Sequence, residues 1–160
     1  MKKWIISSVF LLFITFIGVA FYMYQLVREP LTEAYEQVLV YVENEQLLHD
    51  ISDINYYHGT ETYYVITGED EDGDTAYLWL KEDLSFYDLY KQSDGITAEA
   101  AMAIVHQDYG AEEVVQVRLG YERNMPAYEV MFIDDENRQS YYYVTFEEGA
   151  FMKRYHLNRD

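Results

Sequence analysis

Residues 62–80 have the sequence TYYVITGEDEDGDTAYLWL, and a related stretch, AYEVMFIDDENRQSYYYVTF, occupies residues 127–146. When the two stretches are aligned, Tyr63 falls on Tyr128. In each stretch, two runs rich in aromatic and β-branched residues flank a short polar segment, which is the pattern of two antiparallel strands joined by a turn. The pair therefore predicts an internal repeat of two small β-rich units.

Each repeat is expected to begin with a helix. In the first repeat, apolar residues recur at helical spacing after Pro30, and a proline is well tolerated in the first helical turn. In the second repeat, Thr97 is a candidate N-cap and Gly110 a candidate C-terminal stop. Strands are predicted at residues 51–58, 62–68, 75–81 and 85–91, and at residues 114–121, 127–134, 140–146 and 151–157.

These elements predict an α+β protein. Its two tandem units are expected at residues 28–92 and 93–160, each with one helix packed on an antiparallel sheet.

The acidic segment GEDEDGD at residues 68–74 invites comparison with a calcium-binding loop. A helix–loop–helix calcium site needs acids at positions one, three and five before its glycine and a Glu at position twelve. Counted from Gly73, position one is Gly68 and position twelve is Trp79. The segment is therefore predicted to be a solvated hairpin tip, since turns collect Asp and Gly. Weak cation binding by residues 69–74 is left open.

The N-terminal region contains a long apolar run. No residue from Trp4 to Val27 is charged, and a lysine pair precedes the run. A helix of about 20 apolar residues spans a bilayer core, and flanking lysines favour a cytoplasmic N-terminus. We predict a cytoplasmic tip at residues 1–3, a transmembrane anchor at residues 4–27, and extracytoplasmic units thereafter, in a single-pass cell-membrane protein.

The alternative is a cleaved signal peptide. Gly18, Val19 and Ala20 are small residues of the kind a signal peptidase selects. The apolar run continues past Ala20 with large aromatic residues, which favours the uncleaved anchor.

The net charge of −18 makes nucleic acid an improbable partner, because phosphate contacts need Lys and Arg. All 29 acids follow residue 28, and there is no cysteine. The absence of cysteine excludes disulfides, thiolate catalysis and cysteine zinc sites.

The sequence contains no recognised catalytic motif, so we predict no enzyme activity and no catalytic, cofactor-binding or metal-binding residues. The four histidines never occur at the i, i+4 spacing of helical metal ligands. They are His49, His58, His106 and His156.

The 18 tyrosines exceed what one face of each sheet would use. In the run from residue 141 to 143, consecutive side chains point to opposite faces of a strand. We therefore expect leftover rings to form an interaction surface for a partner protein or a glycan, with Tyr64, Tyr141 and Tyr143 as its candidate residues.

The layout of a lysine pair, an apolar span and two helix-plus-sheet repeats resembles the YpmB-like proteins, the TseB family of cell wall elongation regulators. The second repeat, with GITAEAAMAIV, AYEVMF and SYYYVTFEEGAFMKRY, resembles a PepSY domain. The resemblance implies two tandem cystatin-like folds without enzyme activity. It also implies a role in peptidoglycan synthesis through a membrane-bound penicillin-binding transpeptidase. No functional residue is transferred from the family.

Three functions follow as hypotheses. The first is a membrane-anchored interaction module that regulates cell wall elongation. The second is a module that binds peptidoglycan or another glycan directly. The third is a PepSY-type inhibitor of an extracellular peptidase.

Overall fold

The computed structural model of the chain describes residues 2–111 and 113–158, with side-chain surroundings described for residues 12–24, 33–111 and 113–158. The chain divides into two compact units, Met1–Val42 and Glu43–Asp160. We describe each unit by itself.

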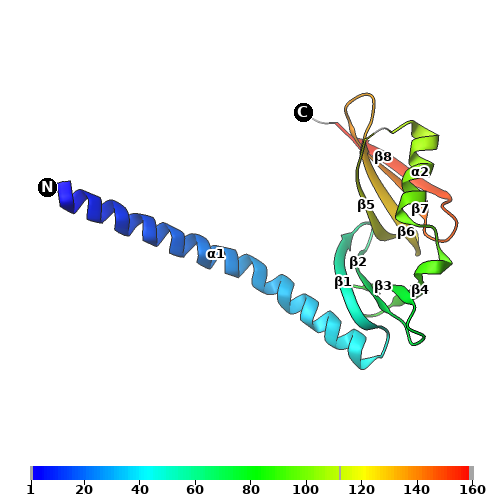
Figure 1. Ribbon diagram of the computed structural model, residues 1–160, viewed down its shortest axis with the longest axis horizontal. Helices are drawn as coiled ribbons and strands as arrows, with labels where there is room; N and C mark the ends of the chain where they lie inside the picture. The colour runs from blue at the N-terminus through cyan, green and yellow to red at the C-terminus, as the bar shows by residue number, and fades with distance from the viewer. Residues whose placement is uncertain (1, 112, 159–160) are drawn as a thin grey trace. The chain divides into compact units, whose positions relative to one another are not determined.

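The first unit consists of most of helix α1, which runs from Lys2 to Asn44 (Figure 1). The prediction that a helix begins at Pro30 is wrong, because α1 passes through this residue without a break. A proline removes one backbone donor, and the residues on both sides continue the helix.

The predicted membrane span is not confirmed. Among the described residues we find no helix whose length and apolar character together would let it cross a membrane. Residues 4–11 and 25–27 of the predicted span lie outside the residues whose side chains are described, whereas the side chains of residues 12–24 are exposed. The anchor therefore stays a prediction.

The second unit contains two antiparallel sheets of four strands each, in the orders β1-β2-β3-β4 and β5-β6-β7-β8. The α+β class is thereby confirmed, and the cystatin-like assignment stays a prediction. The first sheet comprises β1 (His49–His58), β2 (Thr62–Glu69), β3 (Thr75–Lys81) and β4 (Tyr87–Lys91). The second comprises β5 (Glu113–Glu122), β6 (Met125–Ile133), β7 (Gln139–Thr145) and β8 (Phe151–Leu157).

A short 3-10 turn, η1 (Gln92–Asp94), and helix α2 (Ala98–Tyr109) connect the sheets along the chain. The predicted caps of α2 are confirmed. The Thr97 hydroxyl accepts a hydrogen bond from the Ala100 N–H, and Gly110 ends the helix in the left-handed conformation with φ of 65°.

One aromatic core joins α2 and the inner faces of both sheets. Trp79 of the first sheet and Phe146, which follows β7, are fully buried, with ring centroids 5.3 Å apart. Ala101 and Val105 of α2 belong to the same cluster. Figure 1 shows α2 lying along the second sheet. Side chains alternate along β6, so that Tyr128, Val130 and Phe132 all face this core.

The two sheets meet where Tyr57 of β1 packs on the backbone of Gly120 in β5. A Cβ atom at position 120 would overlap the Tyr57 ring, so only glycine allows this contact. Both β1 and β5 are edge strands of their sheets. Each has a register irregularity, between His49 and Asp53 in β1 and between Val114 and Gln116 in β5.

Candidate functional site

The acidic segment forms the turn between β2 and β3, as predicted. The Asp70 carboxylate accepts hydrogen bonds from the backbone N–H groups of Asp72 and Asp74, both at 2.9 Å. Gly73 occupies the left-handed region with φ of 82°, which suits a glycine. The hydrogen bond from the Asp74 N–H is the largest influence on the pKa of Asp70 and lowers it.

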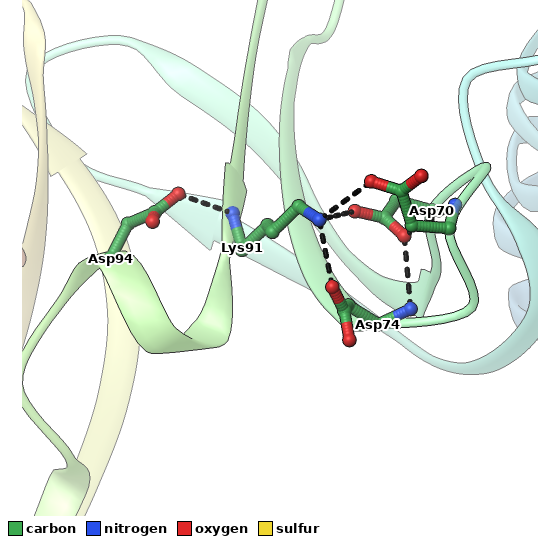
Figure 2. Close-up of polar contacts among 5 residues, drawn as sticks. Asp70, Asp74, Lys91 and Asp94 are labelled. Carbon is green, nitrogen blue, oxygen red and sulfur yellow. Dashed lines mark hydrogen bonds and ion pairs between the residues drawn. The ribbon is translucent and has the colours of Figure 1, made fainter.

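The Lys91 ammonium of β4 lies among the three carboxylates of this turn (Figure 2). Its Nζ is 3.1 Å from Asp70, 2.8 Å from Asp72 and 2.7 Å from Asp74. These hydrogen bonds, led by that to Asp72, raise the pKa of Lys91. The carboxylate oxygens lie within 4.8 Å of one another, a spacing that suits a metal ion, and the ammonium already provides a counter-charge. Lys91 was missed from the sequence because strand pairing alone brings it to the turn.

The turn between β6 and β7 repeats this pattern. The Asp134 carboxylate accepts from the N–H groups of Glu136 at 3.1 Å and Arg138 at 2.9 Å, at the same sequence offsets as in the first turn. Arg138 Nε and the Ser140 hydroxyl also donate to it. Burial tends to raise the pKa of Asp134, but these hydrogen bonds outweigh it and lower the pKa to about 2. Asp70 is thus structurally equivalent to Asp134, whereas the alignment of Tyr63 with Tyr128 pairs Asp70 with the next residue, Asp135.

A buried carboxylate holds the two sheets together. Glu122, at the end of β5, is only 2% exposed. It accepts hydrogen bonds from the Tyr57 hydroxyl at 2.8 Å and the Thr60 hydroxyl at 2.9 Å, both from the first sheet's β1–β2 hairpin. Lys153 of β8 pairs with it at 2.7 Å. Burial tends to raise the pKa of Glu122, and the contacts, led by that to Lys153, reverse the shift and lower it.

A second buried carboxylate, Glu129 of β6, lies on the face of the strand opposite to Tyr128 and Val130. Arg118 Nε pairs with it at 2.6 Å, and the Tyr143 hydroxyl donates to it. Burial, followed by this hydrogen bond, raises the pKa of Tyr143. The hydroxyls of Tyr143 and Tyr155 lie 3.2 Å apart. Neither buried carboxylate could be recognised from the sequence alone, because each is one acid among 29.

The candidate tyrosine surface is less exposed than the sequence suggested. Tyr64 is 5% exposed and Tyr143 is 2% exposed, so the expectation of leftover exposed rings is wrong for these two. Tyr141 is half-buried and stacks on the exposed Tyr155, with ring centroids 4.8 Å apart. Tyr141 and Tyr143 lie on one face of the second sheet, and Tyr64 lies in the first sheet. Their role in binding a partner stays a prediction.

The four histidines lie on three different elements, with His49 and His58 in β1, His106 in α2 and His156 in β8. His58 Nδ1 lies 2.9 Å from the Thr62 hydroxyl. Within the described part of the chain, the only group of acids or histidines with metal-binding spacing is the aspartate turn, which contains no histidine.

The fold and these contacts define a protein built of two packed antiparallel sheets. Comparison with known protein families adds a more specific similarity. Residues 39–81 match the family described as the Cell wall elongation regulator TseB-like domain. The resemblance to the TseB family predicted from the sequence is confirmed.

Two relatives from Bacillus subtilis are similar over most of their length. The "Probable cell wall elongation regulator TseB" of strain 168 is 27% identical over 155 residues, covering 95% of this chain and 96% of the relative. The solved structure described as "YpmB protein from Bacillus subtilis" has a TM-score of 0.71 and 26% identity, covering 76% of this chain and 96% of that chain.

Proposed function

We propose that this protein regulates cell wall elongation. The observation that carries the proposal is the similarity to a probable cell wall elongation regulator over 95% of the chain. Because the match extends across both sheets and α1, the proposal concerns the whole chain and not one borrowed domain.

The protein acts as an extracytoplasmic interaction module and not as an enzyme. The name of the Bacillus subtilis relative, a probable regulator, supports this. The two buried carboxylates, which would be the first candidates for catalysis, are both engaged in ion pairs and hydrogen bonds within the fold. Glu122 and Glu129 are each paired with a cation and hydrogen-bonded to a tyrosine, as expected of groups that join strands.

The protein is held at the cell membrane by α1, with its N-terminus in the cytoplasm. The uncharged run at residues 4–27 and the lysine pair before it support this orientation. A tether confines the module and a membrane-bound partner to one surface, which raises their effective concentration and lets a weak interface suffice.

The partner in this proposal is a membrane-bound penicillin-binding transpeptidase. Crosslinking in intact cells, followed by capture of the full chain and detection with fluorescent penicillin, tests it. A penicillin-labelled band is expected in the captured fraction. Deleting the gene is expected to reduce incorporation of fluorescent D-amino acids along the sidewall.

The matched control replaces residues 1–27 with a cleavable signal peptide, so that the same second unit is exported without a tether. This variant is expected to lose the crosslink and to leave sidewall labelling low. Unchanged labelling after gene deletion would refute the role in elongation, and an unlabelled capture would refute the transpeptidase as partner.

A further inference from the structure

A cavity of about 380 Å³ opens between the two sheets, and Tyr57, which donates to Glu122, is among its lining residues. Edge strand β1 contributes Asp53 and Asn55, and edge strand β5 contributes Gln116. The rings of Tyr77 and Tyr128 belong to its wall. Its volume falls in the range of about 300–1,000 Å³ that is typical of small-molecule sites.

The Tyr128 hydroxyl is a polar group without a hydrogen-bond partner among the described residues, and Tyr128 lines this cavity. Its residue is only 4% exposed, and no described residue makes a hydrogen bond with it. Within the described chain, the fully buried side-chain nitrogen or oxygen atom that lacks a partner is Trp79 Nε1. The Tyr128 hydroxyl is therefore not fully buried, and it meets the solvent of the cavity that Tyr128 lines. A buried ring with a free hydroxyl is a ready donor and acceptor for a ligand.

The other polar side chains of the cavity also keep hydrogen-bonding capacity. Asn55 Nδ2 donates to Asp53 Oδ2 at 2.5 Å, which orients the amide and leaves its carbonyl oxygen available. Gln116 makes no side-chain hydrogen bond to the described residues. Tyr77 is half-buried, and its hydroxyl accepts from Gln92 at 2.8 Å, so its ring is held in place.

This combination of groups suits a sugar ring. The C–H face of a sugar packs on an aromatic ring, whose face carries partial negative charge, while its hydroxyls pair with planar amide and carboxylate groups. The net charge of −18 opposes an anionic ligand.

An extended peptide fits less well. Strand addition needs a regular row of free backbone N–H and C=O groups. Both edges interrupt that row beside the cavity, between His49 and Asp53 and between Val114 and Gln116.

We propose that the cavity between β1 and β5 binds a neutral sugar unit of a saccharide chain. The Tyr128 hydroxyl, Asn55 and Gln116 make the hydrogen bonds, and the Tyr77 ring provides the apolar wall. The site lies wholly in the second unit, and the proposal for it does not depend on the proposed transpeptidase partner. A chain that binds saccharide without affecting elongation supports the site alone.

Calorimetric titration of the purified full chain with chitotetraose, a neutral β-1,4-linked N-acetylglucosamine oligomer, tests the proposal. Binding is expected for the wild type. Tyr128→Phe removes only the hydroxyl and is expected to weaken binding about two- to tenfold, as is Asn55→Ala. The matched control is Tyr87→Phe, which removes an exposed hydroxyl on β4 outside the cavity and is expected to leave affinity unchanged. Circular dichroism melts confirm that each variant is folded.

Three results would overturn the proposal. The first is an absence of heat with chitotetraose at millimolar concentration. The second is that the Tyr128→Phe and Asn55→Ala variants bind chitotetraose with the same affinity as the Tyr87→Phe control. The third is that the chain binds tetra-alanine and not the saccharide, and that Tyr128→Phe weakens this peptide binding. That result would assign the cavity to peptides.

Discussion

Replacing Lys153 with Met would test how the two sheets are held together. The ammonium of Lys153 lies 2.7 Å from the buried carboxylate of Glu122 and 4.3 Å from the ring centroid of Tyr143. Methionine has a similar length and keeps the apolar packing of the stem. The substitution therefore removes the charge and leaves Glu122 buried without a cation.

The expected loss of unfolding free energy is about 2–4 kcal/mol, near the lower part of the range for breaking a buried ion pair. The lower part applies because the Lys153 side chain is 26% exposed and the hydroxyls of Tyr57 and Thr60 still donate to the carboxylate. Adding Glu122→Gln to Lys153→Met removes the unpaired charge and is expected to restore about 1–2 kcal/mol through the coupling of the pair.

The loss depends on pH in a defined direction. In the wild type the pKa of Glu122 is lowered, so its contribution is present above the unfolded value of about 4.3 and is lost as pH falls through the folded pKa. Without Lys153, burial is opposed only by the hydrogen bonds from Tyr57 and Thr60, so the pKa of Glu122 is expected to rise and the variant to lose stability as pH rises through it. The difference between wild type and variant is therefore expected to be larger at about pH 7 than at about pH 5.

Urea unfolding followed by tryptophan emission measures these differences. Trp79 is fully buried in the shared core, and Trp4→Phe in every variant makes Trp79 the sole reporter. Lys81→Met, which breaks the exposed pair with Glu61, is the control and is expected to cost less. A loss for Lys153→Met no greater than that for Lys81→Met, or a loss that grows toward acid pH, would refute the reasoning.

Three further changes have defined outcomes. Gly120→Ala places a methyl group on the Tyr57 ring and is expected to cost about 1–3 kcal/mol in urea unfolding, and an unchanged midpoint would contradict this contact. Asp134→Asn removes a carboxylate whose pKa is lowered to about 2, so its stabilisation is present above about pH 4 and lost toward pH 2. Thermal melts should therefore show a deficit for Asp134→Asn at about pH 5 that shrinks in acid, and a deficit independent of pH would exclude this linkage. Thr97→Ala removes the hydrogen bond from the Ala100 N–H and is expected to cost about 1 kcal/mol, with Thr97→Ser as the variant that retains it.

Local sequence patterns determined the secondary structure of the second unit. The predicted strand at residues 75–81 coincides with β3, and the predicted strand at residues 151–157 coincides with β8. The caps at Thr97 and Gly110 were also evident, because the hydrogen bonds and backbone angles of a cap involve only neighbouring residues. The start predicted at Pro30 failed, since a proline that can open a helix can also lie within one.

Tertiary structure alone decided which polar side chains meet. Lys91 reaches the aspartate turn through the pairing of β3 with β4, and Lys153 of β8 reaches Glu122 of β5 within the second sheet. Packing of the second sheet buried Tyr143, and it left the Tyr128 hydroxyl without a hydrogen-bond partner among the described residues. The alternation of a strand reveals which residues share a face, but burial depends on what covers that face, and this is determined by contacts between residues distant in sequence.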